Sequence, residues 1–308
     1  MVGVEPRSAR RPRYGRGSGT RLGAVGVALA ATVLLGASPG SGRGAIAGGR
    51  AVDTMLFTAG SCVSFAPTSG QRHETVFIDA GHGGPDPGAV GVTVAGRTVH
   101  EAVETLSVAL DTVASLRARG YRVVLSRTGV SAVARPVGGD LSGGVFTGQG
   151  VHRDLIARDL CANRARANLL LGLYFNASPS ASVGGSLTLY DAARPFWRAN
   201  LRLADLMQRA ALARLKAGGW SVPDDGVRPD VGFGSSVTSA DEAYGHLLII
   251  GPAKAGYFST PSAMPGALIE PLFITNPSEA SIADSVRGQR AIALGLATAV
   301  EQYFGARR

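Results

Sequence analysis

Strand-like and helix-like segments alternate along most of this 308-residue chain. Several strand-like segments are apolar without interruption, which is typical of strands that are buried on both faces of a sheet. The segments that we expect to be strands are 76–80, 121–126, 169–175, 185–190, 246–250 and 266–273. The segments that we expect to be helices are 102–119, 153–168, 196–217 and 277–304. The pattern predicts an α/β fold, a single domain with a mostly parallel or mixed sheet and helices on both faces.

The first expected strand runs into a histidine that is surrounded by glycines, Gly81-His82-Gly83-Gly84. Glycine permits backbone conformations that other residues rarely adopt. Open α/β sheets bind their ligands beyond the carboxyl ends of the strands. His82 is therefore a candidate site residue.

Two glutamates mark further candidate positions. Glu101 stands at the start of the helix expected from 102, where it would also stabilise the helix dipole without any other role. Glu270 ends the apolar run 266–269. A carboxylate at the end of a buried strand is partly desolvated, which raises its pKa and suits general acid–base chemistry.

The basic character of the chain is concentrated at its N-terminus. Residues 1–47 carry seven arginines against one glutamate and supply +6 of the formal net charge of +9, which leaves +3 for the remainder. This distribution argues against nucleic-acid binding. The uncharged apolar stretch 22–36 is shorter than the about 20 residues of a membrane-spanning helix, and Ala45-Ile46-Ala47 fits a signal-peptidase site.

We therefore expect a signal peptide over 1–47, an N-terminal arm over 48–73 and one catalytic domain over 74–308. Cleavage near Ser38 and an uncleaved anchor remain alternatives. The processed protein is expected to be exported, as a periplasmic, cell-wall-associated or secreted monomer without a stable membrane span.

The chain contains two cysteines, Cys62 in the arm and Cys161 in an expected helix. In an oxidising compartment such a pair often forms a disulfide, here between the arm and the domain. Two unpaired cysteines are the alternative.

Five segments together resemble a known family. They read "FIDAGHGGPDPGAVG", "HEAVETLSVAL", "GYRVVLSRTG", "RDLCANRARAN" and "PGALIEPLFITNP". In this order, over residues 74–304, the chain resembles the zinc-dependent N-acetylmuramoyl-L-alanine amidases of bacterial cell-wall metabolism. The resemblance implies a phosphorylase/hydrolase-like fold, one Zn²⁺ and hydrolysis of the amide bond between N-acetylmuramic acid and L-alanine in peptidoglycan or muropeptides.

The resemblance also implies roles for individual residues. His82 and Glu101 match two zinc ligands of the family, with Glu104 as the weaker alternative to Glu101. Glu270 matches the catalytic glutamate. The other matched positions are Arg127, Arg158, Asn163 and Asn176, of which Arg158 and Asn176 are expected to bind substrate.

One position departs from the family pattern. The family has a second zinc histidine in a strand that ends Ser-Ile-His-Ala-Asn-Ala, and here Tyr174 stands in its place within "GLYFNA". Three outcomes are open. Tyr174 ligates zinc as a phenolate, which would lower the charge of the site and slow the enzyme; one of His100, His152 and His246 replaces the ligand; or no zinc binds.

In the mechanism that the resemblance implies, zinc polarises the carbonyl and Glu270 moves the proton of the attacking water. The alternative is a catalytically impaired homologue that binds peptidoglycan or regulates cell-wall enzymes. A zinc peptidase has less support because no H-E-x-x-H pair occurs. The segment 218–245, rich in glycine and turn residues, is either a lip over the cleft or a passive surface loop.

Overall fold

The centre of the protein is an eight-stranded mixed sheet, as the alternating sequence predicts. The computed structural model describes residues 46–233 and 239–305, so that most of the expected signal peptide lies outside the described residues. The strands are, in their order across the sheet, β1 (Gly49–Ala51), β2 (Ser61–Phe65), β6 (Arg122–Arg127), β3 (Thr75–Ala80), β9 (Leu169–Leu173), β12 (Gly266–Glu270), β10 (Ser186–Tyr190) and β11 (Asp224–Pro229).

The four central strands β6, β3, β9 and β12 are parallel, so that their carboxyl ends meet at one edge of the sheet. β10 runs antiparallel to β12 and parallel to β11, whereas β2 runs antiparallel to both β6 and β1. The carboxyl ends of β10 and β11 therefore lie at the edge opposite to that of β12. This reversal places two groups of functional side chains at opposite edges.

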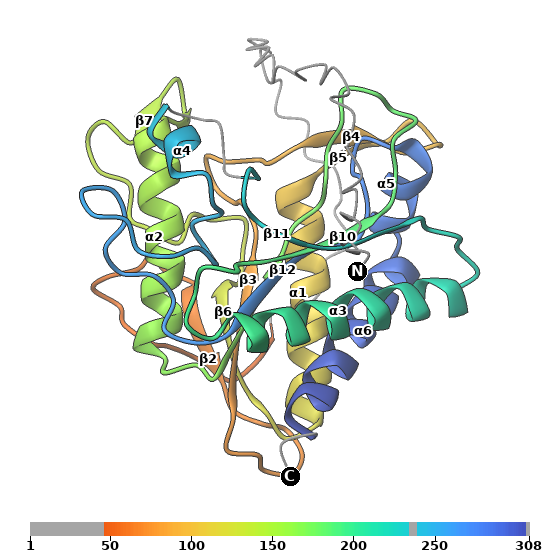
Figure 1. Ribbon diagram of the computed structural model, residues 1–308, viewed down its shortest axis with the longest axis horizontal. Helices are drawn as coiled ribbons and strands as arrows, with labels where there is room; N and C mark the ends of the chain where they lie inside the picture. Colours follow the sequence, from red (N-terminus) through yellow and green to blue (C-terminus); the bar gives the residue numbers. More distant parts are fainter. Residues whose placement is uncertain (1–45, 234–238, 306–308) are drawn as a thin grey trace, which may run out of the picture. The chain divides into compact units, whose positions relative to one another are not determined.

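Helices cover both faces of the sheet (Figure 1). One face carries α1 (Glu101–Ala118), α3 (Trp197–Ala217) and α6 (Val286–Gly305), and the other carries α2 (Gly148–Arg164). The remaining short elements are α4 (Ser239–Tyr244), α5 (Pro277–Ala283) and the hairpins of β4 (Val90–Val92) with β5 (Thr98–His100) and of β7 (Leu141–Ser142) with β8 (Val145–Phe146).

Strand β3 shows why the strands read as continuous apolar runs. Val76 and Ile78 belong to the core under α1, α3 and α6, whereas Phe77 between them belongs to the core under α2. All three side chains are fully buried. A strand with apolar neighbours on both faces shows no alternation of polar and apolar residues, and the sequence of β3 shows none.

The expectation of a strand at 246–250 was wrong. This segment forms turns, in which the backbone N–H groups of Ile250 and Gly251 donate to the carbonyl of Leu247. Its apolar side chains, including Ile249, pack in the core beside α2. The run is apolar because it covers the sheet, and not because it is part of the sheet.

Other boundaries also differ from those expected. The arm 48–73 contributes β1 and β2 to the sheet, and the segment 218–245 contains β11 and α4. The last helix is divided into α5 and α6, because the Ser285 hydroxyl accepts a hydrogen bond from Gly288 N (3.0 Å) and caps a new helix. None of the helices in the described part of the chain is both long and apolar enough to cross a bilayer.

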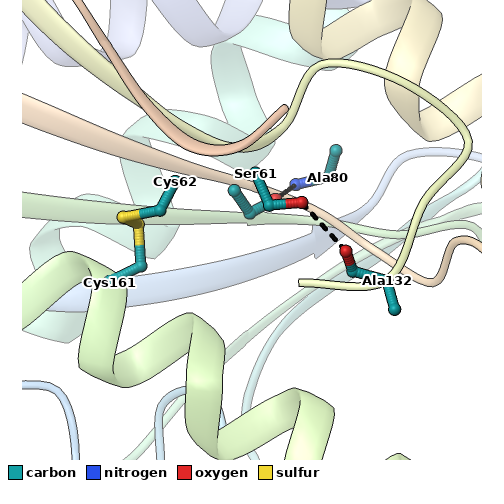
Figure 2. Close-up of a disulfide and its surroundings, with 6 residues drawn as sticks. Ser61, Cys62, Ala80, Ala132 and Cys161 are labelled. Carbon is teal, nitrogen blue, oxygen red and sulfur yellow. Dashed lines mark hydrogen bonds between the residues drawn. A yellow bond between two sulfur atoms is a disulfide. The ribbon is translucent and has the colours of Figure 1, made fainter. Parts of the chain in front are cut away.

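A disulfide joins Cys62 in β2 to Cys161 in α2, the pair that the sequence left open between bridged and free (Figure 2). The two Cα atoms are 5.6 Å apart, and both residues are fully buried. Beside the bridge, the Ser61 hydroxyl donates to the carbonyl of Ala132 (2.9 Å). The disulfide thus connects β2, in the antiparallel part of the sheet, to α2, which covers this face of the sheet.

We expect reduction of this disulfide to destabilise the protein by about 2–5 kcal/mol, because the bridge closes a loop across a sequence separation of 99 residues and so restricts the unfolded chain. Urea unfolding with and without a phosphine reductant measures the difference. The control is the double variant Cys62→Ser, Cys161→Ser, whose midpoint should not respond to the reductant. An unchanged midpoint in the wild type would contradict a stabilising bridge.

Candidate active site

The histidine after β3 is held between two carboxylates. His82 Nδ1 lies 2.8 Å from Asp86 Oδ2, and His82 Nε2 lies 3.0 Å from Glu101 Oε1. The backbone of His82 has φ of +60°, a conformation that few residues other than glycine adopt. Burial lowers the pKa of His82, but the charges and hydrogen bonds of Glu101 and Asp86 outweigh it and raise the pKa to about 10.

Glu101 is the first residue of α1, and its side chain turns inward to His82 instead of outward to solvent. Its Oε1 accepts a hydrogen bond from Phe175 N and its Oε2 one from Ala89 N, each at 2.9 Å. Gly88 makes this close approach possible, since a Cβ at that position would lie 2.8 Å from Glu101 Oε2 and from His82 Cδ2. The carboxylate is therefore fixed in position by backbone donors. Its role extends beyond the helix dipole.

Tyr174 lies beside His82, with the ring centroids 5.3 Å apart in an edge-on arrangement. Its hydroxyl donates to Asp79 Oδ2 at 2.8 Å. Burial and then the Asp79 charge raise the pKa of Tyr174 well above its usual range, so the phenol keeps its proton. The Tyr174 hydroxyl is hydrogen-bonded to Asp79, and the Tyr174 ring meets the His82 imidazole edge to face. This geometry does not present a phenolate to an ion at His82 and Glu101.

Beneath His82 is a buried ionic network centred on Arg158. The guanidinium donates to Asp79 Oδ1 (2.7 Å), to Asp154 Oδ2 (2.8 and 2.9 Å) and to the carbonyls of Ala80 and His82 (2.8 and 2.7 Å). Burial lowers the pKa of Arg158, but the charges of Asp79 and Asp154 outweigh it and keep the pKa well above its usual value. Arg158, expected to bind substrate, thus has its donors engaged with the protein and fixes the backbone of His82.

Arg127, at the end of β6, holds the same loop from the other side. Its guanidinium donates to the carbonyls of Ala80, Gly81 and Ala102 at 2.7–3.0 Å. Burial lowers the pKa of Arg127 to about 10, so the side chain stays charged at neutral pH. Two buried arginines therefore fix the chain around the strand end from which His82 projects.

Glu270 ends β12 and lines a cavity of about 270 Å³ together with His82 and Tyr174. Burial and then the charge of Glu101 raise the pKa of Glu270 to about 8, against an opposing effect of His82. The side chain is thus a proton acceptor of moderate strength. Leu155, Leu248 and other apolar side chains make up much of the remaining wall.

Other residues singled out by the sequence lie elsewhere. The Asn176 carboxamide accepts from the neighbouring Ala177 N (2.8 Å), and Asn176 is outside the residues that line this cavity. Asn163 binds the 261–263 loop through the carbonyl of Pro261 and the N–H of Ala263. Glu104 points away from His82 and accepts from Gln289 on α6 (2.8 Å).

None of the three histidines considered as a substitute ligand joins His82 and Glu101. His100 is exposed at the N-cap of α1. His152 contacts the carbonyl of Tyr257 (3.1 Å). His246 lies with two aspartates near the opposite edge of the sheet.

The fit of zinc to these residues follows from the donor set. His82 Nε2 and Glu101 Oε1 face each other at 3.0 Å, and Asp86 orients the imidazole from behind, as second carboxylates do at zinc histidines. Catalytic zinc sites usually have three protein ligands. Among the described residues, no group of three His, Cys, Asp or Glu ligand atoms that all lie within 4.8 Å of one another contains both His82 and Glu101. His82 and Glu101 thus supply two of the three protein ligands that such a site usually has.

Several residues of this site were missed from the sequence. Asp86 stands four residues after His82, and a search for carboxylates near the histidine would have found it. Asp79, inside the apolar run of β3, signals a buried charge that requires a partner. Asp154 stands four residues before Arg158 in an expected helix, and this spacing is a sequence signal for an ion pair.

Comparison with known proteins identifies the family of the chain. Residues 76–302 match the Amidase_3 family, described as N-acetylmuramoyl-L-alanine amidase. The chain belongs to this family. Its members are hydrolases that cleave the amide bond between N-acetylmuramic acid and L-alanine in peptidoglycan.

Individual relatives of the amidase support the assignment. The germination-specific N-acetylmuramoyl-L-alanine amidase of Bacillus subtilis is 26% identical over 238 residues, which are 77% of this chain and 81% of the relative. N-acetylmuramoyl-L-alanine amidase LytC of the same organism is 30% identical over 68% of this chain, but the match spans 31% of LytC. The structure of the CwlD amidase from Clostridioides difficile, in complex with the GerS lipoprotein, has the same fold (TM-score 0.55, 20% identity, 76% of this chain and 100% of that chain).

We expect Tyr174→Phe to lower the free energy of unfolding by about 1–3 kcal/mol, because it leaves Asp79 Oδ2 without its hydroxyl donor while the ring is kept. Chemical denaturation measures this loss. Metal analysis of the same samples should show that the variant retains whatever zinc the wild type holds. Loss of zinc in the variant would instead make the phenol a ligand.

Asp159 gives a prediction about pH. It is fully buried, neither carboxylate oxygen has a hydrogen-bond partner in the described structure, and burial followed by the Asp79 charge raises its pKa well above the usual value. The folded state therefore holds a proton that the unfolded state releases above about pH 4, so this group makes the protein less stable as the pH rises.

Asp159→Asn removes this titration. The stability difference between Asp159→Asn and the wild type should move in favour of the variant by up to about 1.4 kcal/mol per pH unit between pH 5 and 8, measured by urea unfolding. Asp205→Asn, at a partly exposed position on α3, serves as the matched control. A difference that stays constant with pH would show that Asp159 is charged in the folded state.

Proposed function

We propose that this amidase carries out its hydrolysis in the cavity between His82 and Glu270. The observation that carries the proposal is that His82, fixed by Glu101, and the carboxylate of Glu270 line one cavity at the carboxyl ends of β3 and β12. Ligands of open α/β sheets bind at such ends.

The proposal includes one zinc ion held by His82 Nε2 and Glu101 Oε1, without Tyr174. A zinc ion lowers the pKa of a coordinated water and polarises a substrate carbonyl. The chain's own contribution is to hold both ligands still: Asp86 orients the imidazole, the N–H groups of Ala89 and Phe175 orient the carboxylate, and Arg158 fixes the backbone of His82.

Glu270 has the role of proton carrier in this proposal. Its carboxylate accepts a proton as the oxygen of a water molecule bonds to the carbonyl carbon of the lactyl group. The carbon–nitrogen bond then breaks, and Glu270 gives the proton to the departing nitrogen of L-alanine. A pKa near 8 suits both halves of this transfer, because the group accepts and releases a proton at similar cost near neutral pH.

The place of action is proposed on related grounds. The peptidoglycan substrate of the family lies outside the cytoplasm, which agrees with export directed by residues 1–47. The disulfide between Cys62 and Cys161 suits the same oxidising compartment. We further propose that the processed chain acts on peptidoglycan as a monomer.

The test of Glu270 is hydrolysis of a purified muropeptide by Glu270→Gln. We expect turnover to fall about 10²- to 10⁴-fold, because the carboxamide cannot carry the proton. The matched control is Glu301→Gln on α6. The Glu301 carboxylate pairs with Arg119, neither residue lines the cavity, and this variant should retain wild-type turnover. Wild-type turnover in Glu270→Gln would remove the role assigned to this residue.

The same assay separates the enzyme from a protein that has kept the fold without the reaction. Muropeptide binding by the zinc-loaded wild type, with no release of peptide, would favour the impaired homologue. Tyr174→His, which restores the family's second histidine, should then raise turnover if the missing ligand is the cause.

A further inference from the structure

A second group of potential ligands lies near the opposite edge of the sheet. Asp191 follows the last residue of β10, Asp230 follows the last residue of β11, and His246 belongs to the turn segment that covers the sheet beside α2. Because β10 and β11 are parallel neighbours, their carboxyl ends bring the two aspartates together. His246 also lines the cavity that reaches Glu270.

The spacing of the three side chains matches a metal site. His246 Nδ1 lies 2.9 Å from Asp191 Oδ2 and 3.2 Å from Asp230 Oδ1, and the three ligand atoms all lie within 4.8 Å of one another. Ligands about 2.0–2.1 Å from a tetrahedral zinc ion are about 3.3 Å apart. Among the described His, Cys, Asp and Glu side chains, this is the one group of three with such closeness.

Both carboxylates are fully buried and aimed by the backbone. The N–H groups of Ala193 and Arg194 donate to Asp191 Oδ1, and Leu247 N donates to Asp230 Oδ2. The remaining oxygen of each aspartate points to the centre of the group. Asp191 Oδ2 is buried there and accepts no hydrogen bond from the described residues, so its contact is the imidazole nitrogen.

The charge of the group also indicates a cation. Two buried carboxylates face a single imidazole, which leaves a net negative charge even when the imidazole is protonated. The Arg194 guanidinium donates its hydrogen bonds to the carbonyls of Gly251 and Ser262, and its charge is shared between Asp191 and the buried Asp159. Buried charge of this kind is costly unless it is paired or coordinates a metal. A divalent ion balances two carboxylates and a neutral histidine.

We propose that Asp191, Asp230 and His246 bind a divalent transition-metal ion, with zinc as the preferred occupant. Two oxygens and one imidazole nitrogen are ligands that suit zinc, and three protein ligands leave a fourth position for water. The ion would join the ends of β10 and β11 to the 246–250 segment. This site is independent of the reaction proposed for Glu270 and of the ion at His82 and Glu101.

The experiment counts zinc in four forms of the full chain: wild type, His246→Gln, Asp230→Asn, and the double variant His82→Gln, Glu101→Gln. Metal is removed from each protein with a chelator, and zinc affinity is then measured by titration against a chromophoric competitor. Native mass spectrometry gives the number of zinc ions bound per chain. We expect His246→Gln and Asp230→Asn to bind the ion of this site at least about 100-fold more weakly, while the double variant keeps one tightly bound ion per chain.

His152→Gln is the matched control, since His152 is another partly buried histidine that lies outside the group. It should bind as much zinc as the wild type. The double variant provides a second readout without altering the group itself: its thermal midpoint should rise with zinc and stop rising at one equivalent, and cobalt in place of zinc should give the visible absorption of a tetrahedral nitrogen–oxygen site.

Each outcome has a definite meaning. A double variant that binds no zinc, or that is not stabilised by it, overturns the proposal even if the group's own variants fail to fold. Equal zinc binding by the wild type and a folded Asp230→Asn also overturns it. If the double variant keeps its ion but the wild type does not hydrolyse muropeptide, the metal site at Asp191, Asp230 and His246 is supported. The reaction proposed for Glu270 is then contradicted.

Discussion

The fully buried guanidinium of Arg158 is the contact on which the rest of the site depends. It connects β3 through Asp79, its own helix through Asp154, and the functional loop through the carbonyl of His82. Removing one partner from a buried ion pair leaves an uncompensated charge and costs about 3–5 kcal/mol. Because Asp79 also accepts a hydrogen bond from the Tyr174 hydroxyl, one network fixes both Tyr174 and His82.

Much of the fold could be predicted because the strands near the centre have no exposed face. Their apolar runs reflect burial on both sides, and β3, β6, β9 and β12 were recognised largely from that property. The same property misled at 246–250, where Ile249 and its neighbours are buried in a turn. Periodicity reports burial, and it does not distinguish a strand from a loop that is pressed against the core. β11 is polar and partly exposed, so it gave no such signal.

The candidate site could be predicted in part. The glycines around His82 and the position of Glu270 at a strand end follow from local sequence, and both residues line one cavity. The direction of the Tyr174 hydroxyl does not follow from local sequence, because it depends on Asp79 in a neighbouring strand. The meeting of Asp191, Asp230 and His246 depends on the strand order β12-β10-β11, which local sequence patterns do not reveal.

The backbone of His82 has a thermodynamic consequence of its own. A residue with a side chain at φ of +60° is strained by about 1–2 kcal/mol relative to glycine, and glycine occupies both neighbouring positions. Folding alone would thus be served better by a third glycine. The imidazole is kept at the expense of stability, so the loop is a place where the requirements of chemistry and of folding oppose each other. If the imidazole were not required, replacing His82 with glycine would therefore stabilise the protein.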